Sequence, residues 1–596
     1  MYDFNKEYNS INDELTIITA QCKKVTNIKI IVFLMEVFLF FYNQKKQILP
    51  SWLLLIVLIV CFVILWLYHE SLFRKKDYIE TKLEIITRYQ LRNEGKWASF
   101  ENTGEEFLSE DSYVERDLDL FGEQSLYQYL CVANTAEGKK KLAEYLTTWN
   151  PEYEQIKERE EAVKDLINRN DFRLKVETLG ALGKKKNKNN KDEWYYDFIE
   201  YLQKDRRQKA NKFYVCGVIL PILSLILFVM VYMHRLSEWC LIGSLIVQMA
   251  LSYYVSYLNR DVIQKLLRFS LSLDDIIDIA RTIAEESFEA SLLQKLQNEI
   301  NSEDALIMGV KQLSKITDRI SVRNNVYLHV FLQLFFMYDV HCIRQLFSWK
   351  KEYGGYISKI YKVIGEIEAL LSLSSIALNR EVCFPEILES GKPVFCTEEL
   401  YHPLIDRKKV VANTINVSES VNIITGSNMS GKSTFMRTMG INMILAYAGA
   451  PVCAKNMQLS IMRVSTCMRI TDDVFLGRSS FYAEVLRLKT IVDQSKDNIP
   501  MFILIDEIFK GTNSIDRITG AKEVIRRLNK KHILLFISTH DLEICSLIDE
   551  HEVQGMNYHF VERYENNELC FDYKIRDGKC QSRNAKYILK MAGLID

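Results

Sequence analysis

The ten residues TGSNMSGKST, Thr425–Thr434, have the spacing of a loop that cradles phosphate groups. A glycine, four residues and then Gly-Lys-Ser allow backbone N–H groups and the start of the next helix to face phosphate oxygens. Lys432 would neutralise charge on the β- and γ-phosphates, and the hydroxyl of Ser433 would bind Mg²⁺. The sequence therefore predicts nucleotide-binding residues at Gly426, Ser427, Asn428, Met429, Ser430, Gly431, Lys432, Ser433 and Thr434.

Two later apolar runs end in side chains that could complete this chemistry. The run MFILIDE ends in Asp506, which suits the Mg²⁺ shell, and Glu507, which suits a general base that polarises the attacking water. The run HILLFISTH ends in His540, which would sense the γ-phosphate. Acidic pairs and single histidines are often structural, and it is the phosphate loop upstream that favours chemistry here. We predict Glu507 and His540 as catalytic residues and Ser433 and Asp506 as metal ligands.

The elements that must position these residues are strands and one helix. Val421–Gly426, Met501–Glu507 and His532–His540 are continuous apolar runs, which suit a parallel sheet covered on both faces. The phosphate loop lies between the first of these runs and a helical stretch, which is the context that such a loop requires. From about Pro385 onward the chain is therefore predicted to form an α/β domain.

The middle of the chain predicts helices. Ser112–Asp205 is rich in Leu, Glu and Lys, and Asp261–Arg380 contains no proline and has the apolar periodicity of long amphipathic helices. Met337 and the aromatic residues near it are interpreted as packing rather than as a binding surface. These segments predict an all-α region.

Four apolar segments are long enough, or nearly long enough, to cross a bilayer as helices. Ile48–Tyr68 contains no charged residue, and Phe213–Met233 and Trp239–Leu258 are similar runs. Ile28–Tyr42 is shorter and carries Glu36, but beside Ile48–Tyr68 it is interpreted as the first arm of a hairpin. The sequence thus predicts two transmembrane hairpins; the alternative is buried core helices.

Basic residues predict the orientation of these hairpins. They flank the outer ends of each pair, whereas the two short connectors hold few; the flanking residues are Lys23, Lys24, Arg74, Lys75, Lys76, Arg206, Arg207, Lys209, Lys212 and Arg260. We therefore expect a multi-pass protein of the cell membrane, with both hairpin tips outside and the α/β domain in the cytoplasm, where ATP is.

The overall composition excludes little. The formal net charge is −1, so there is no global basic excess of the kind that marks nucleic-acid binders, although a local basic face could exist. The 13 cysteines include no C-x-x-C pair, which fits reduced thiols better than a disulfide framework or a zinc site.

In order and rough spacing, the motifs resemble those of the MutS family of DNA mismatch-repair ATPases. The phosphate loop, DDVFLGRSSFYAE (Asp472–Glu484), DEIFKGTNSIDR and STHD all have counterparts in that family, as does the pair His402-Pro403 at the start of its ATPase domain. The similarity extends more weakly over Ser112–Asp596, apart from the second hairpin and its surroundings.

The resemblance implies an ABC-type ATPase that works as a dimer, here a homodimer. Each ATP would be held between the phosphate loop of one copy and Gly477–Ser480 of the other, with Ser479 and Ser480 among the binding residues. Asn428 would help to seat the γ-phosphate, and Thr512, Asn513 and Ser514 would lie at the junction between copies. Binding of ATP would be coupled to movement of the helical arms.

The chain also departs from the family in three ways. Before Leu118 there is no room for the domain that reads mismatches, and the second hairpin lies where the family has an arm that clamps DNA. The aromatic residue that commonly stacks on adenine is matched by Val410 or Val411. The phosphate chemistry is unaffected by these differences.

These observations predict a multidomain protein with transmembrane α-helical hairpins, an all-α MutS-type core and lever domain and a C-terminal α/β ABC-type P-loop ATPase domain. The predicted divisions are 1–76 for the first hairpin, 77–205 for a linker and the first part of the helical core, 206–260 for the second hairpin, 261–385 for the rest of the core and lever, and 386–596 for the ATPase domain.

Three functions are compatible with this organisation. The first is a membrane-anchored MutS-like ATPase that couples hydrolysis of ATP to binding of DNA, mismatched or branched. The second is an ABC-like ATPase that drives transport or another membrane process without DNA; the segment GRSSF in place of LSGGQ argues against it. The third is a scaffold switched by nucleotide, which the intact Lys432, Asp506 and Glu507 disfavour.

Overall fold

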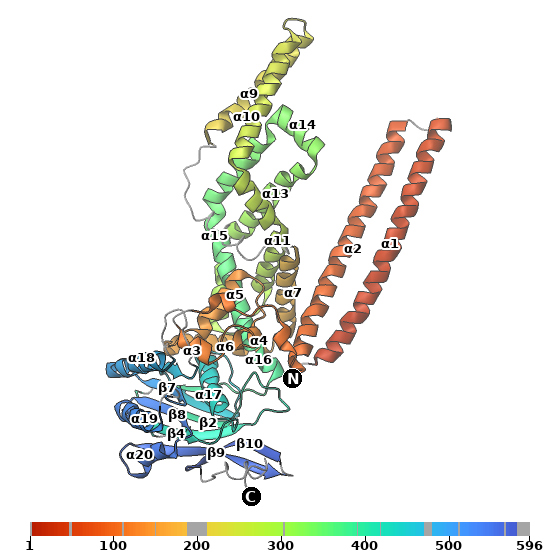
Figure 1. Ribbon diagram of the computed structural model, residues 1–596. Coiled ribbons are helices and arrows are strands. Elements are labelled where there is room, and N and C mark those ends of the chain that lie inside the picture. The colour runs from red at the N-terminus through yellow and green to blue at the C-terminus, as the bar shows by residue number, and fades with distance from the viewer. Residues whose placement is uncertain are drawn as a thin grey trace.

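The protein is elongated, with an α/β domain at one end, a column of helices in the middle and two helical hairpins that point away from the α/β domain (Figure 1). The computed structural model describes residues 3–46, 51–109, 112–149, 151–186, 211–301, 304–389, 391–417, 419–469, 480–509, 513–565 and 568–580. The sequence from Gly578 to Leu594 resembles the closing helices of the MutS ATPase domain, and its residues from 581 onward lie outside this set.

The α/β domain is built on a six-stranded sheet with the order β10-β9-β4-β8-β7-β6. All neighbours are parallel except β9 and β10, which pair antiparallel. The strands are β4 (Val421–Thr425), β6 (Arg463–Cys467), β7 (Met501–Asp506), β8 (Ile533–Thr539), β9 (Gly555–Glu565) and β10 (Glu568–Asp577). Beside it is a four-stranded sheet, β1-β5-β2-β3, formed by Glu386–Leu388, Asn456–Ser460, Phe395–Leu400 and Asn413–Val417. The three strands predicted from the apolar runs are confirmed.

Helices cover both faces of the large sheet, as its continuous apolar strands require. Phe502 and Leu504 pack on the side of α17 (Lys432–Tyr447), whereas Ile503 and Ile505 pack on the side of α18 (Ser480–Gln494) and α19 (Ser514–Leu528). Every residue of β4, β7 and β8 is buried. The short helix α20 (Ser546–Asp549) follows β8.

The middle of the molecule is helical, as predicted. Its longest helix is α15 (Tyr338–Ser374), which packs against α5, α6 and α13. The other helices of this region are α3 (Tyr113–Asp117), α4 (Leu126–Leu130), α5 (Ala136–Leu146), α6 (Tyr153–Ile167), α7 (Asn170–Lys186), α11 (Arg260–Glu285), α12 (Ser291–Asn301), α13 (Asp304–Ser321), α14 (Val326–Phe336) and α16 (Ile376–Asn379).

A buried carboxylate joins this helical column to the α/β domain. Asp117, at the end of α3, accepts hydrogen bonds from the backbone N–H groups of Met468 and Arg469, both at 2.9 Å, and pairs with the guanidinium of Arg487 on α18. Arg487 also donates to the carbonyl of Thr466 at 2.8 Å. The column and the domain therefore share a closed polar contact beside β6.

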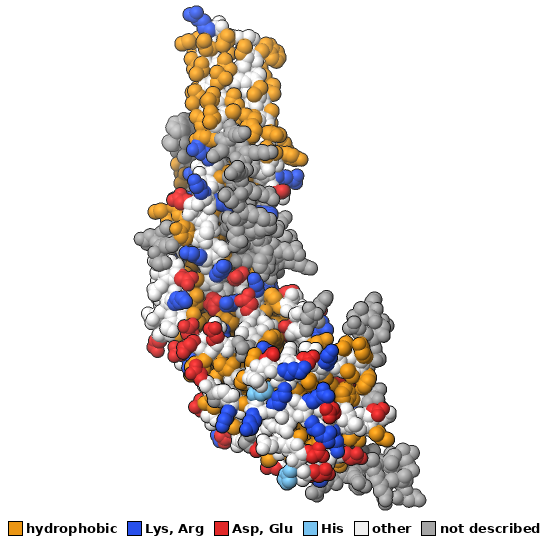
Figure 2. Space-filling view, turned by 90° about the vertical axis from the view of Figure 1, so that its left-hand side faces the viewer, with side chains coloured by type: hydrophobic (Ala, Val, Ile, Leu, Met, Phe, Trp, Pro, Cys, Tyr) orange, Lys and Arg blue, Asp and Glu red, His pale blue; other side chains and the backbone are white. Residues whose placement is uncertain are grey.

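The hairpins are formed by α1 (Phe4–Lys46) with α2 (Ser51–Asn93) and by α9 (Asn211–Tyr232) with α10 (Glu238–Leu258). Within the described residues, three helices are long and apolar enough to cross a membrane, Phe4–Asn43, Phe213–Tyr232 and Glu238–Leu258. A fourth candidate is a bent pair, α14 with the helix after it. Figure 2 shows hydrophobic side chains over the end of the molecule formed by the second hairpin and mixed charges over the opposite end.

The structure confirms some of the predicted membrane spans as long apolar helices and leaves one untested. Those over Phe213–Met233 and Trp239–Leu258 coincide with candidate helices, and Ile28–Tyr42 is part of a longer one. The span over Ile48–Tyr68 includes residues outside the described set, so it stays a prediction.

The interpretation of the aromatic residues near Met337 as packing is wrong in part. Met337 is fully buried, but several of its aromatic neighbours on α14 are exposed.

Candidate functional site

The predicted site residues meet at one edge of the large sheet because parallel strands bring their carboxyl ends together. In the register of β4, β7 and β8, Thr425 lies beside Thr539 and Asp506 lies beside Ser538. The phosphate loop follows Thr425, Glu507 follows Asp506, and His540 follows Thr539. Three segments far apart in the sequence thus end at the same place.

The phosphate loop has a backbone that depends on its glycines. Gly426 and Gly431 have φ of 152° and 106°, values that a side chain disfavours. A Cβ on Gly426 would lie 2.8 Å from the hydroxyl of Ser430, and α17 begins directly after Gly431. The Nζ of Lys432 donates to the carbonyls of Gly426 at 2.9 Å and Ser427 at 2.8 Å, so the ammonium group is held over the loop.

His540 links the loop to the acidic strand end. Its Nε2 lies 2.7 Å from Oδ1 of Asn428 and 2.7 Å from Oε1 of Glu507, so in the Nε2–H tautomer one proton is shared between these two acceptors. The His540 side chain is 35% exposed and that of Glu507 is 18% exposed. The three predicted residues form one network at the surface of the site.

The acidic strand end is held firmly. The hydroxyl of Ser538 donates to Asp506, and the backbone N–H of Glu507 donates to Ser538 at 3.1 Å. Glu507 has a φ of 50°, an uncommon value for a residue with a side chain. The strand therefore turns sharply at Glu507 and presents its carboxylate to the loop.

A second anchor fixes the chain just beyond Glu507. The carboxylate of Glu484, on α18, accepts the backbone N–H of Phe509 at 2.5 Å. Helix α18 begins at Ser480, the last residue of the predicted GRSS segment, although the side chain of Ser480 is not described. Residues 470–479, with Ser479, and Thr512 also lie outside the described set, so their predicted contacts with a second copy stay predictions. Asn513 caps α19 through the N–H of Asp516 at 2.9 Å.

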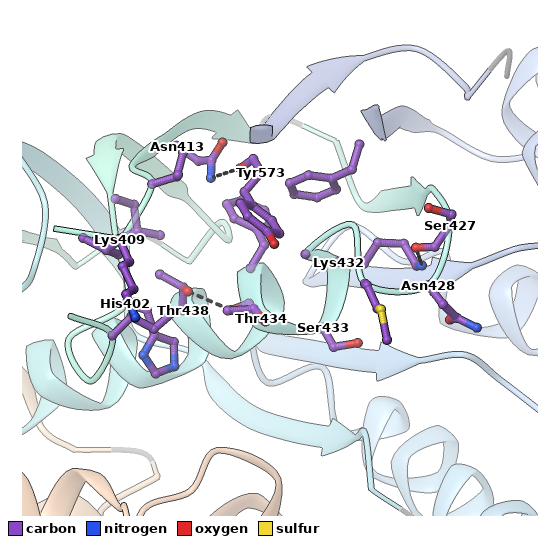
Figure 3. Close-up of a pocket in the computed structure, with 18 of the residues that line it drawn as sticks. His402, Lys409, Asn413, Ser427, Asn428, Lys432, Ser433, Thr434, Thr438 and Tyr573 are labelled. Atoms are coloured by element: carbon purple, nitrogen blue, oxygen red, sulfur yellow. Dashed lines mark hydrogen bonds between the residues drawn. The ribbon is translucent and has the colours of Figure 1, made fainter. Parts of the chain in front are cut away.

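A cavity of about 440 Å³ opens beside the loop (Figure 3). Val410 and Val411, the residues predicted at the position of the missing aromatic, line it. The other lining residues are Leu400, His402, Ile405, Lys409, Asn413, Ser427, Asn428, Met429, Gly431, Lys432, Ser433, Thr434, Phe435, Thr438, Glu507, Phe560 and Tyr573. The cavity thus joins a polar part at the loop to an apolar part suited to a flat ring.

Tyr573 is a residue of this cavity that the sequence did not reveal. It comes from β10, and a Cβ on Gly431 would lie 3.1 Å from its ring. The side chain of Asn413 donates to the carbonyl of Tyr573 at 3.0 Å and fixes this part of the strand (Figure 3). Tyr573 is far from the loop in sequence, so no local spacing signals it.

His402 lies at the other end of the cavity. Burial, with the nearby cation of Arg437 as a second cause, lowers the pKa of His402 to about 4. Its Nδ1 accepts the backbone N–H of Leu404 at 3.2 Å, which requires that this nitrogen carry no proton. The imidazole is therefore neutral near pH 7.

The sheet, the phosphate loop and the acidic strand end define the C-terminal part as a P-loop ATPase domain. Residues 422–596 match the family model for MutS domain V. The C-terminal part of the chain is therefore similar to the MutS domain V ATPase, which implies hydrolysis of ATP.

The curated relatives match about two fifths of this chain. The chain is 31% identical to the DNA mismatch repair protein MutS of Listeria welshimeri over 254 residues, 41% of this chain and 29% of the relative. It is 31% identical to MutS of Listeria monocytogenes over 264 residues, 42% and 30% of the two chains. With MutS of Aquifex pyrophilus it shares 29% identity over 239 residues, 39% and 27%. The chain spans about three tenths of the length of these relatives.

Proposed function

We propose that the protein is a membrane-anchored ATPase that binds and hydrolyses ATP between two copies of the chain and couples this to binding of DNA. The observation that carries the proposal is the meeting of the phosphate loop, Glu507 and His540 at the carboxyl ends of three parallel strands. The match to MutS domain V supports the same chemistry.

The residues of the site have separate roles in hydrolysis. The loop N–H groups and Lys432 hold the phosphates, Asn428 seats the γ-phosphate, and Glu507 accepts a proton from the attacking water. His540 bonds to both Asn428 and Glu507, so a γ-phosphate that engages Asn428 would also change the surroundings of the base. The adenine would lie in the apolar part of the cavity, against Tyr573 and the two valines.

Asp506 and Ser433 fit Mg²⁺, because both offer oxygen ligands and the metal takes its remaining ligands from phosphate and water. When bound, the ion would neutralise charge that develops on the phosphates. The hydrogen bond from Ser538 orients the Asp506 carboxylate for this role.

The dimer and the DNA ligand are proposed from the similarity to MutS. By this similarity, Ser479 and Ser480 would contact the nucleotide held by the other copy. Helix α18, which begins at Ser480, is anchored in its own copy by the hydrogen bond from Phe509 to Glu484. The relatives are named DNA mismatch repair proteins, which supports DNA as the ligand and mismatched or branched DNA as the structures to test.

The apolar helices support a place in the cell membrane. The charge bias of the sequence favours the cytoplasmic side for the ATPase domain, and both hairpins point away from that domain (Figure 1). A membrane process without DNA is the alternative that these helices favour.

Two substitutions test the site. Glu507→Gln should lower ATP turnover by roughly 10²–10⁴-fold while ATP binding persists, since a base contributes about this much. Lys432→Ala should weaken ATP binding itself. Lys455→Ala is the matched control, because Lys455 is an exposed lysine of the same domain that pairs with Glu398. Equal turnover in wild type and Glu507→Gln would refute the role of Glu507.

The DNA ligand is tested by turnover of the vesicle-reconstituted protein with homoduplex, mismatched and branched DNA. Stimulation that falls steeply with salt would support DNA contacts through phosphates. Turnover that no DNA changes, in a protein that still binds ATP, would favour the membrane process without DNA.

A further inference from the structure

Helix α14 presents a wide apolar face that no other element of the described residues covers. Tyr327 is 90% exposed, and Phe331 and Phe336 are each 53% exposed. Val326, Leu328, Val330 and Phe335 are exposed as well. Contiguous apolar surface of this kind marks contact with a partner or a membrane.

The opposite face of α14 is bonded to α10 by polar groups. Gln248 donates to the carbonyl of Leu334 at 2.8 Å, and Ser252 donates to the side chain of Gln333 at 2.5 Å. Further along, Ser256 donates to Asp339, in the first turn of α15, at 2.5 Å. Gln248 and Ser252 are fully buried, so α14 supplies the partners that these groups need in an apolar surrounding.

These contacts fix the depth of α14 relative to the candidate span. Gln248 lies halfway along Glu238–Leu258, the apolar helix that is long enough to cross a bilayer. The last turn of α14, which bonds to Gln248 through Leu334, must therefore lie at the same level as the middle of that span. The exposed aromatic side chains of α14 would then face acyl chains.

The shape of α14 is that of a segment that enters a bilayer and turns back. With 11 residues it is roughly 16 Å long, about half of the hydrocarbon core. Met337 then adopts a left-handed conformation, with φ of 50°, and the chain bends by 86° into the next helix. One half-length helix followed by a sharp bend is compatible with re-entry and too short for a full span.

We propose that α14 is a re-entrant helix embedded in the acyl-chain layer against α10. The inference rests on the proposed membrane placement of the second hairpin. The embedded helix would connect the bilayer directly to the helical column, because α15 begins immediately after Met337 and runs toward the ATPase domain (Figure 1).

The test is quenching by lipids that carry a spin label on the acyl chain. An environment-sensitive fluorescent amino acid replaces Phe331 in the full chain, reconstituted in phosphatidylcholine vesicles with a doxyl group at acyl carbon 12. The same amino acid at Val247 on α10, 57% exposed, reports the depth of the span, and at Met308 on α13, 58% exposed, it reports the column. ATP binding by each labelled protein verifies that it has folded.

The inference predicts that fluorescence at position 331 is lost as strongly as at position 247, with no loss at position 308. Quenching at 247 without quenching at 331 would overturn it and assign the face of α14 to water or to a second copy of the chain. If position 247 is also unquenched, the proposed placement of the hairpin fails and the inference fails with it.

Discussion

Two histidine–carboxylate networks lie in different regions of the molecule and differ in how far protein groups enclose them. His540 bonds to Asn428 and Glu507 at the mouth of a cavity, and its side chain is 35% exposed. The Nε2–H of His329 can donate to Asp339, whose side chain is only 3% exposed and also accepts hydrogen bonds from Arg323 and Ser256. The side chain of His329 itself is 23% exposed. One network is open to a ligand, and the other is closed by protein groups.

The difference shows how burial decides the role of a polar cluster. A closed network uses its hydrogen-bonding groups within the fold, so its loss is expected to cost stability. An open network at strand ends can exchange its bonds for bonds to phosphate, so its loss is expected to cost turnover. The predictions below test this distinction.

The largest effect on stability is expected at Asp117, another closed contact. Asp117→Asn removes the charge that balances Arg487, a guanidinium almost fully enclosed by protein. Breaking a buried pair in this way costs about 3–5 kcal/mol. The change is measured as a lower urea midpoint for unfolding of the α/β domain.

Asp119 provides the control for this substitution. It lies two residues away and pairs with Arg469 and Arg437, but it is more exposed, so Asp119→Asn should cost at most about 1 kcal/mol. Similar midpoints for the two variants would contradict the view that burial sets the cost.

The two histidines themselves give the sharpest contrast. If His540 donates to the reacting phosphate as proposed, His540→Ala should lower ATP turnover about 100-fold. It should leave the free energy of unfolding within about 0.5 kcal/mol of the wild-type value. His329→Ala should do the reverse, with a stability loss of about 1 kcal/mol from broken hydrogen bonds. Turnover and urea unfolding of both variants are compared. A large loss of turnover in His329→Ala alone would show that His329, and not His540, supports catalysis.

Residues close to a motif could be predicted from the sequence, because local geometry fixes what they face. The apolar runs before Gly426, Glu507 and His540 are strands β4, β7 and β8, and their shared edge follows from parallel pairing. The loop glycines, Lys432 and Glu507 occur where the spacing predicts them. Their chemical roles, and the predicted domain boundaries, stay predictions.

Residues that depend on long-range packing could not be predicted. Tyr573 reaches the cavity only because β10 pairs with β9, which lies next to β4. The aromatic residues of α14 have the composition of a packed helix, and sequence periodicity does not distinguish a protein neighbour from lipid. Their exposure results from the tertiary packing, in which the opposite face of α14 contacts α10 and Gln333 accepts a hydrogen bond from Ser252.

Tyr573 gives a smaller effect that tests the cavity. If its ring stacks on adenine, Tyr573→Ala should weaken ATP binding about tenfold, since stacking on a base contributes roughly 1–3 kcal/mol. Tyr573→Phe keeps the ring and should bind ATP as wild type does. Binding is measured by titration with ATP and with tripolyphosphate, which has no base. An equal loss for both ligands would assign Tyr573 to the shape of the loop instead.

The smallest effect is expected at His402 and depends on pH. The folded protein holds its pKa at about 4, below the ordinary value of 6.5, so the unfolded chain takes up the proton first as the pH falls. Stability from the neutral ring is thus complete above pH 6.5 and is lost as the pH falls toward 4. At pH 5 the loss is about 1 kcal/mol, discounted for the part of the ring that reaches solvent.

The variant His402→Asn tests this pH dependence, because asparagine keeps an acceptor for the N–H of Leu404 but does not titrate. Wild type should lose stability between pH 6.5 and pH 5 and the variant should not. The urea midpoint of the wild type should therefore fall toward that of a less stable variant over this range. Parallel pH profiles would show that burial of this ring does not contribute to the acid sensitivity of the domain.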